Sequence, residues 1–360
     1  MNGAAADAEI LAARSLAVGW SGRIERVLAS GIDLEIRSGE LAVLIGPNGS
    51  GKSTLLRTLV GLQAPLSGSV ALCGSQVAQM TVEERSRRAA CVFTDRYDPG
   101  YFTVFDIVAF GRYPYTGARN RLESGDLAAV RGAIAAVGLE GLASRGFSEL
   151  SDGERQKALI ARAIAQDCPL LVFDEPTAFL DAPARVEVFH IVRDLACASR
   201  KAIILSTHDI DHALRYADRL WLMDREHRFK AGAPEDLAMS GGIGRAFDGD
   251  GFRFDVSSGS FKSAAARSPL CVEIVGSASP AETWVERLCE RLGLVPVRED
   301  TVLGDGSRPT KIAGIAIEES EGGPLFSIRF ADVELEAASY SELADVLKRM
   351  LAERAGRSEA

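Results

Sequence analysis

The chain has 360 residues, of which 47% are hydrophobic and 25% are charged, and both fractions are ordinary for a folded globular protein. Its formal net charge of −9 excludes a protein that binds nucleic acid through a broad basic face. The longest apolar runs, such as Leu41–Ile45 and Leu170–Phe173, are too short to cross a bilayer. The start of the chain, Met1–Glu9, lacks the basic and apolar segments of a signal peptide. We therefore expect a soluble protein that does not bind nucleic acid and reaches a membrane only through a partner.

The cysteines are scattered along the chain, without a CxxC pair and without a histidine close by. They are Cys73, Cys91, Cys168, Cys197, Cys271 and Cys289. This spacing predicts buried free thiols in a reducing compartment rather than zinc ligands or a disulfide framework.

Apolar, strand-like runs alternate with helical patterns through the first two-thirds of the chain, which is typical of an α/β fold with a parallel sheet. After the strand at 41–45 comes a loop that fits the P-loop pattern G-x-x-x-x-G-K-[ST]: Gly46-Pro47-Asn48-Gly49-Ser50-Gly51-Lys52-Ser53. Glycines let backbone N–H groups turn toward a phosphate, and the following helix adds its positive end. Lys52 supplies a charge for the β and γ phosphates, and the Ser53 hydroxyl would bind Mg²⁺. The sequence therefore predicts that residues 46–54, Thr54 included, bind a nucleotide.

Three later segments add groups suited to phosphate chemistry. Residues 150–156, LSDGERQ, begin a predicted helix where Ser151 and the N–H of Gly153 could contact a γ-phosphate. The buried strand at 169–173 ends in Asp174, which would hold the Mg²⁺ shell, and in Glu175, which could orient the attacking water. The strand at 203–205 ends in the run STHD, which contains His208.

The composition changes at 241–262. This stretch is rich in Gly and Ser, which predicts a tether or a domain boundary. A compact unit follows, with strands expected at 272–275, 312–317 and 326–330 and a turn at 322–324. One helix should begin at Ser279, with a capping box and with Trp284 in its buried stripe, and the last helix should begin at Ser341.

Together these segments resemble the ATP-binding cassette of ABC transporters. Residues 150–156 are similar to the LSGGQ-type signature, and the order Walker A, signature, Walker B is that of the family. The resemblance covers about residues 10–240. It implies an α/β P-loop ABC ATPase domain, with a mixed sheet core and a helical subdomain, at 1–245. A linker at 246–270 and a small α+β domain at 271–360 would follow.

The resemblance also implies roles for individual residues. Lys52, Glu175 and His208 would be catalytic, with His208 as the switch histidine that hydrogen-bonds the γ-phosphate. Trp20 is similar to the aromatic residue that stacks on adenine, and 178–181 is similar to the D-loop. In the family, two subunits form a head-to-tail dimer, so Ser151 and Gly153 would complete the ATP site of the opposite chain, in a homodimer or with a paired ABC subunit.

Residues 102–108 and 111–115 resemble the "TV-x-E-LV-x-x-GR-x-P" region of importers for ferric siderophores, haem and cobalamin. The resemblance implies an ATP hydrolase bound peripherally to the cytoplasmic face of the bacterial inner membrane. Its partners would be an integral membrane permease and a periplasmic or surface substrate-binding protein. An exporter ATPase, a soluble ABC ATPase acting on nucleic acid or ribosomes, and a P-loop kinase are the alternatives.

Two positions depart from the family pattern. Asp95 stands where the family has the glutamine of its Q-loop, and this acid could join Ser53 and Asp174 as a metal ligand or turn away. Asp152 replaces the first signature glycine, and we expect it to cap its helix and to point away from the phosphate.

Overall fold

The computed structural model describes residues 8–22, 25–93, 100–117, 121–249, 251–256, 258–263, 270–275, 279–298, 310–320, 323–330 and 333–358. The chain divides into two compact units. The first holds Met1–Asp248 and Phe254–Phe261, and the second holds Gly249–Arg253 and Lys262–Ala360. Within the described residues, no helix combines the length and the apolar character needed to cross a membrane.

The centre of the first unit is a sheet whose strands are β3 (Leu41–Ile45), β6 (Ala89–Val92), β7 (Leu170–Asp174), β8 (Ala202–Ser206), β9 (Arg219–Met223) and β10 (Phe229–Gly232). Their order is β10-β9-β3-β8-β7-β6, with β10 antiparallel to β9 and the other neighbours parallel. Every residue of β3, β7 and β8 is buried, because both faces of the sheet are covered. The mixed sheet with helices confirms the predicted α/β class, and the carboxyl ends of β3, β7 and β8 meet at one edge.

A second, antiparallel sheet covers one side of this core. Its strands are β1 (Glu9–Trp20), β2 (Arg26–Arg37), β4 (Ser67–Leu72) and β5 (Ser75–Gln76), in the order β2-β1-β4-β5. The helix α1 (Lys52–Leu59) buries Leu55, Leu56 and Leu59 in the core that the two sheets share. Two short helical segments follow β5, namely η1 (Val77–Gln79) and α2 (Val82–Ser86).

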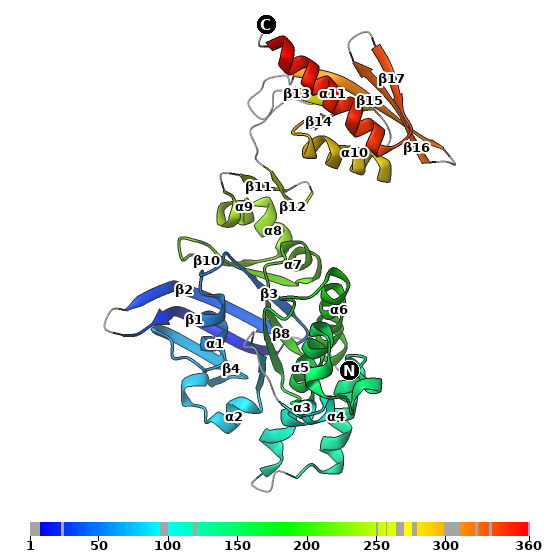
Figure 1. The fold of residues 1–360 in the computed structure, drawn as a ribbon. Helices are drawn as coiled ribbons and strands as arrows, with labels where there is room; N and C mark the ends of the chain where they lie inside the picture. The colour runs from blue at the N-terminus through cyan, green and yellow to red at the C-terminus, as the bar shows by residue number, and fades with distance from the viewer. Residues whose placement is uncertain are drawn as a thin grey trace, which may run out of the picture. The chain divides into compact units, whose positions relative to one another are not determined.

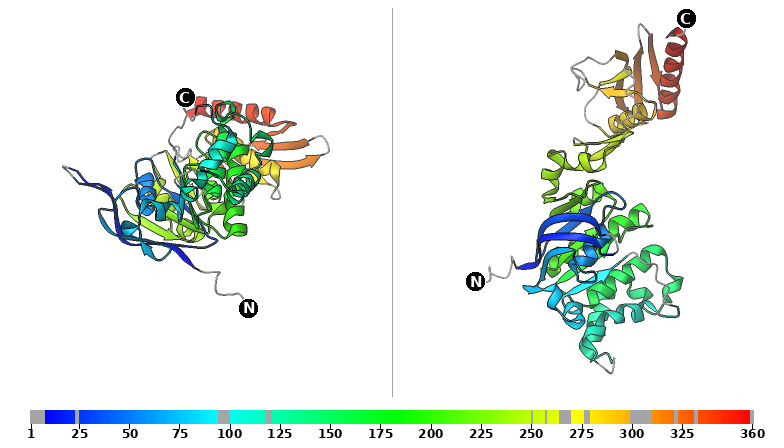
Figure 2. Two further views of the ribbon diagram at one scale, coloured as in Figure 1. Left: turned by 90° about the horizontal axis from the view of Figure 1, so that it is seen from below. Right: turned by 90° about the vertical axis from the view of Figure 1, so that its left-hand side faces the viewer.

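The other face of the central sheet is covered by helices and helical turns. They are α3 (Val104–Ala109), η2 (Phe110–Tyr115), α4 (Ser124–Ala136), η4 (Glu140–Leu142), η5 (Phe147–Glu149), α5 (Asp152–Ala165), α6 (Ala182–Ser199), α7 (Ile210–Tyr216), α8 (Pro234–Met239) and α9 (Gly242–Phe247). Figures 1 and 2 show α3, α4 and α5 gathered on one side of the unit, away from β1 and β2.

The composition predicts a tether or a domain boundary in the Gly- and Ser-rich stretch after residue 241, and the two compact units do divide within 248–262, but the described residues there form regular structure. The stretch contains α9 and a hairpin of β11 (Phe252–Asp255) and β12 (Ser260–Ser263). The ring of Phe261 lies 6.0 Å from that of Phe247 and 5.3 Å from that of Phe254, measured between centroids. These apolar contacts attach the hairpin to the first unit, which the local composition does not reveal.

The second unit contains a five-stranded sheet with the strand order β14-β13-β15-β16-β17. Its elements are β13 (Leu270–Val275), α10 (Pro280–Arg291), β14 (Val295–Val297), β15 (Thr310–Ser320), β16 (Gly323–Phe330), β17 (Val333–Ala337) and α11 (Tyr340–Ser358). Helices α10 and α11 pack on one face of the sheet (Figure 1). The strands and helices expected here are found, whereas β14 and β17 were not predicted and Gly323 and Pro324 belong to β16 rather than to a turn.

Two expectations for α10 need correction. Trp284 is 54% exposed, and its ring lies 4.9 Å from the guanidinium carbon of Arg287 instead of entering the core. Ser279 caps the helix by accepting the N–H of Glu282, but the carboxylate of Glu282 pairs with Arg298 at 2.7 Å. A strong ion pair beside the helix end thus holds the carboxylate that a capping box would need.

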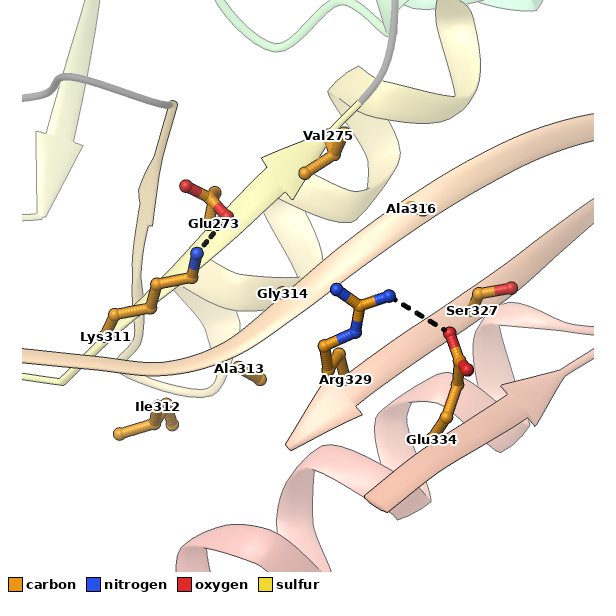
Figure 3. A pocket seen from close by; sticks show the side chains of 10 residues that line it. All are labelled: Glu273, Val275, Lys311, Ile312, Ala313, Gly314, Ala316, Ser327, Arg329 and Glu334. Atoms are coloured by element: carbon orange, nitrogen blue, oxygen red, sulfur yellow. Dashed lines mark hydrogen bonds and ion pairs between the residues drawn. The ribbon is translucent and has the colours of Figure 1, made fainter. Parts of the chain in front are cut away.

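The face of the second sheet away from the helices carries a shallow cleft of about 390 Å³ (Figure 3). Small residues lie at its centre, including Gly314 and Ser327. Ion pairs flank them, one of which joins Arg329 to Glu334 at 3.6 Å. The cleft follows from strand register, because Gly314 pairs with Arg329 and Arg329 pairs with Glu334 across neighbouring strands.

Candidate functional site

The loop between β3 and α1 has backbone angles that require glycine. Gly49 has φ 79° and Gly51 has φ 103°, both in the left-handed region that side chains disfavour. The carbonyl of Gly51 accepts the N–H of Leu55 at 2.9 Å, so α1 begins directly at the end of the loop. The first N–H groups of a helix have no partner within the helix and favour an anion, so this turn is suited to a phosphate.

Gly46 lets the loop approach the neighbouring strand β9 closely. A Cβ built on Gly46 would lie 2.5 Å from the carbonyl oxygen of Met223 and 2.8 Å from Oγ of Ser50. Ser50 Oγ is buried and has no hydrogen-bond partner among the described residues. A cradle without room for a Cβ, lined by an unpaired hydroxyl, fits a polar ligand held by the loop.

Lys52 lies at the start of α1 and is buried, with 6% of its side chain exposed. Its ammonium donates to the carbonyl oxygens of Gly46 at 2.9 Å and Pro47 at 3.3 Å and lies 3.9 Å from Oε1 of Glu175. Burial lowers the pKa of Lys52 from its ordinary value, and the charges of Glu175 and Asp174 oppose part of that shift. The cation is therefore held against the phosphate loop and faces the acids at the end of β7.

One hydroxyl from the neighbouring strand β8 contacts both Asp174, the last residue of β7, and Glu175, the next residue. Asp174 is the register partner of Ser206 in the parallel pair of β7 and β8. Ser206 Oγ donates to Asp174 Oδ1 at 2.6 Å and accepts the backbone N–H of Glu175 at 2.9 Å. Asp174 and Ser206 are both buried, so these bonds lie away from solvent.

Glu175 departs from β7 in an unusual backbone conformation, with φ 51°. A residue other than glycine rarely adopts this angle without surrounding structure that holds it. Its Oε1 lies 2.6 Å from Nε2 of His208, and the same nitrogen lies 3.5 Å from Nζ of Lys52. The fold therefore brings Lys52, Asp174, Glu175 and His208 into one cluster from the ends of two parallel strands, β7 and β8, and from the start of α1.

The remaining predicted residues lie as follows. Ser53 is exposed in the first turn of α1, and Thr54, next to it, is buried. Trp20 ends β1 and is 52% exposed. Asp95 lies outside the described residues, so its predicted metal contact stays a prediction.

The signature segment starts α5, but its cap differs from our expectation. Ser151 is the capping residue, because its Oγ accepts the N–H of Glu154 at 3.3 Å while Glu154 accepts the N–H of Ser151 at 2.8 Å. Asp152 is the first residue of the helix, and its carboxylate lies 3.4 Å from Nη1 of Arg155. Because Ser151 and Glu154 already form the reciprocal pair of bonds that caps the helix, the prediction that Asp152 caps it is wrong.

Arg155, the ion-pair partner of Asp152, also holds the start of α5 in place. Its Nη2 donates to the carbonyl of Ser148 at 2.6 Å, which ties the start of α5 to the turn before it. Gly153 lies within the first turn of α5, and a Cβ there would meet Cβ of Ala184 at 3.4 Å, an ordinary contact distance.

Sequence reasoning assigned no role to Arg185 and Asp209. Arg185, in α6, donates to the carbonyl of Leu180 at 3.2 Å and to Oδ2 of Asp209 at 3.0 Å. It thus connects the segment 178–181 with the residue after His208. Burial would raise the pKa of Asp209, but hydrogen bonds from His212 and Arg185 outweigh it and lower the pKa. No local pattern could reveal this link, because the two partners lie in separate motifs.

The donors near Lys52 suit a magnesium nucleotide. Asp174 supplies a buried carboxylate and Ser53 a hydroxyl, and hard oxygen donors are what Mg²⁺ prefers. These residues would hold the metal, which would supply charge neutralisation at the phosphates.

Comparisons with known proteins show which family the chain resembles. The sequence pattern of the family described as ABC transporter matches residues 29–178. The chain is 40% identical over 239 residues to the uncharacterized ABC transporter ATP-binding protein MJ0873 of Methanocaldococcus jannaschii, covering 66% of this chain and 81% of that protein. It is 41% identical to the cobalamin import ATP-binding protein BtuD of Halobacterium salinarum, covering 60% of this chain and 54% of that protein.

A further relative and a solved structure extend the comparison. The achromobactin transport ATP-binding protein CbrD of Dickeya dadantii is 34% identical, with 63% of this chain and 83% of that protein covered. The solved structure of cbiO1 from Clostridium perfringens, part of the ABC transporter complex cbiONQ, superposes with a TM-score of 0.57 at 26% identity. It covers 66% of this chain and 93% of the solved chain. All these alignments leave part of the 360 residues uncovered.

Proposed function

The chain belongs to the ATP-binding subunits of ABC transporters and is an ATPase, and we propose that it drives import of an iron chelate such as a ferric siderophore, of haem, or of cobalamin. The cluster of Lys52, Asp174, Glu175 and His208 around the loop 46–51 is the observation that carries the chemical part of this proposal. The importer class is supported by relatives whose names state cobalamin import and achromobactin transport.

Each member of the cluster has a defined task in the proposed reaction. The loop N–H groups and Lys52 hold the β and γ phosphates, while Ser53 and Asp174 bind Mg²⁺. Glu175 orients the attacking water, and His208 contacts the γ-phosphate. Nε2 of His208 lies 2.6 Å from Oε1 of Glu175, so the group that would contact the γ-phosphate and the group that would orient the water are already adjacent. Positioning and charge account for most of the expected rate enhancement, as in other phosphoryl transfers.

The proposed assembly is a head-to-tail dimer of this chain, or a pair with another ABC subunit. In it, Ser151 and Gly153 of each chain complete the ATP site of the other, and Trp20 stacks on adenine. The hydroxyl of Ser151 now donates to Glu154 at 2.9 Å, so contact with a phosphate would exchange one charge-assisted hydrogen bond for another.

Exposed aromatic residues support a permease contact near α3 and η2. Phe102 is 43% exposed and Tyr113 54%, and both rings lie against Phe110, at 5.0 and 5.8 Å between centroids; Tyr101, next to Phe102, is fully exposed. Large apolar side chains gathered on a surface commonly mark a binding site. We place the membrane permease here, at the cytoplasmic face of the inner membrane, with a substrate-binding protein on the opposite side.

ATPase activity in proteoliposomes tests both parts of the proposal. The vesicles would contain this chain with its co-purified permease, and ferric siderophores, haem or cobalamin would be added with the binding protein. One cargo should stimulate hydrolysis, and Glu175→Gln should bind ATP normally but stop turnover. Hydrolysis that ignores every cargo would contradict the importer assignment, and near-normal hydrolysis by Glu175→Gln would remove Glu175 from its role.

A further inference from the structure

The buried hydroxyl of Ser206 bonds both acids at the end of β7. It donates to Oδ1 of Asp174 at 2.6 Å and accepts the backbone N–H of Glu175 at 2.9 Å. The backbone carbonyl of Ser206 also accepts that N–H at 3.2 Å. The side chain has no exposed surface.

The direction of these bonds determines what the hydroxyl can do. A serine has one proton to donate, and the N–H of Glu175 can only donate, so the hydroxyl proton must point to Asp174. A donor bonded to one carboxylate oxygen limits the rotation of that carboxylate and so fixes the direction in which the acid is presented. Bonds of this kind from outer residues commonly orient the ligands of a metal.

The same hydroxyl acts on Glu175 through the backbone. Glu175 holds a positive φ of 51°, a conformation that persists only where neighbouring groups fix it. Its N–H is held by both oxygens of Ser206, which fixes the point where the chain leaves β7. From that point the Glu175 side chain reaches His208 at 2.6 Å.

We propose that Ser206 is a positioning residue that couples the metal-binding acid Asp174 to the water-orienting acid Glu175. The inference rests on the proposed roles of those two acids. Neither role requires a hydroxyl at position 206, because any strand-end residue would keep the backbone bond between its carbonyl and Glu175. The hydroxyl adds a single group that turns Asp174 and holds Glu175 at once.

The test compares Ser206→Ala with Ser206→Thr, which keeps the hydroxyl, and with Ser206→Cys, which replaces the hydroxyl by a larger thiol that is a weak donor. Thr58→Val is a matched control, because Thr58 is also a buried hydroxyl, donating to the carbonyl of Thr54 at 2.8 Å in the second turn of α1. Mn²⁺ affinity is measured by electron paramagnetic resonance with a non-hydrolysable ATP analogue, beside kcat, KM for ATP and the thermal midpoint.

For Ser206→Ala we expect Mn²⁺ affinity and kcat to fall by about 10- to 100-fold, with KM for ATP within about twofold of the parent. Ser206→Thr should recover most of the loss and Ser206→Cys should lie between. Thr58→Val should lower the thermal midpoint while leaving Mn²⁺ affinity unchanged.

Two results would overturn the proposal. One is a Ser206→Ala protein that, like the control, loses stability alone. The other is a Ser206→Cys protein with the parent's Mn²⁺ affinity and kcat, which would decide the matter if the alanine variant failed to fold. Glu175→Gln is measured alongside to separate failure of this inference from failure of the proposed function. If Glu175→Gln still hydrolyses ATP, the proposed function fails. If Glu175→Gln is inactive but Ser206→Ala binds Mn²⁺ normally, only the inference about Ser206 fails.

Discussion

Replacing Gly46 with alanine tests whether nucleotide binding depends on the close approach of the phosphate loop to β9. The new Cβ would lie 2.5 Å from the carbonyl oxygen of Met223 and 2.8 Å from Oγ of Ser50, and real Cβ contacts essentially never fall under 3.0 Å. Met223 ends β9, which pairs with β3 and β10, so its carbonyl cannot recede without disturbing the sheet. The loop must therefore move instead.

The expected loss of ATP affinity follows from the energetic cost of the overlap. Overpacking of this kind costs about 1–3 kcal/mol of folding free energy. If about 1.4 kcal/mol of that strain acts on the binding-competent loop, ATP affinity falls about tenfold. Titration with a fluorescent ATP analogue and urea unfolding measure the two quantities separately, and we expect Gly46→Ala to lose at least tenfold in affinity.

Gly74→Ala is the matched control. Gly74 lies in the turn between β4 and β5 with φ 76°, and a Cβ there would meet nothing within 4 Å. Its alanine variant carries the strain of a left-handed residue, about 1–2 kcal/mol, without any overlap. It should lose stability and keep its ATP affinity; if Gly46→Ala also kept its affinity, the argument from backbone approach would be refuted.

Two further predictions concern the ion pair at α4 and the free thiols. Asp126 accepts the N–H of Glu123 and pairs with Arg112 at 2.8 Å, and these bonds hold the pKa of Asp126 below its ordinary value. The ion pair therefore contributes its full stability at neutral pH and loses it as the pH falls from the ordinary pKa of Asp through the lowered pKa of Asp126. Asp126→Asn should cost about 2 kcal/mol in urea unfolding at pH 7, and this difference from the parent should shrink as the pH is lowered below that of an ordinary Asp. Burial raises the pKa of Cys289 to about 12, so iodoacetamide at pH 8 should label the exposed Cys197 within minutes and Cys289 only after unfolding, as read by mass spectrometry. A loss for Asp126→Asn that stays the same as the pH is lowered, or rapid labelling of native Cys289, would contradict these two arguments.

The prediction for the thiols was right in one respect and incomplete in another. All six cysteines are free, as the spacing indicates. Cys73 and Cys197 are nevertheless exposed rather than buried, because Cys73 lies in the turn between β4 and β5 and Cys197 lies on the outer side of α6. Sequence spacing can exclude a disulfide or zinc framework, but it does not state which face of an element a thiol occupies.

Several features of the chain could be predicted because they depend on neighbours in the sequence. The loop 46–51 needs glycine where φ is positive, and buried parallel strands need continuous apolar runs such as 170–173. The capping bond at Ser279 likewise involves residues three apart. The same local reasoning failed for Trp284, since the helix pattern cannot tell how far the buried stripe extends across a small sheet.

The sequence by itself determined the α/β class, the phosphate loop and the identity of the acids and histidine at strand ends, because these depend on backbone geometry and on short apolar patterns. Only the tertiary structure decided that Ser206 joins Asp174 to Glu175, that Arg185 reaches Asp209, and that a hairpin follows α9. Each of these features is a contact between segments distant in the chain. Such contacts depend on strand order and register, which become defined only when the whole core packs.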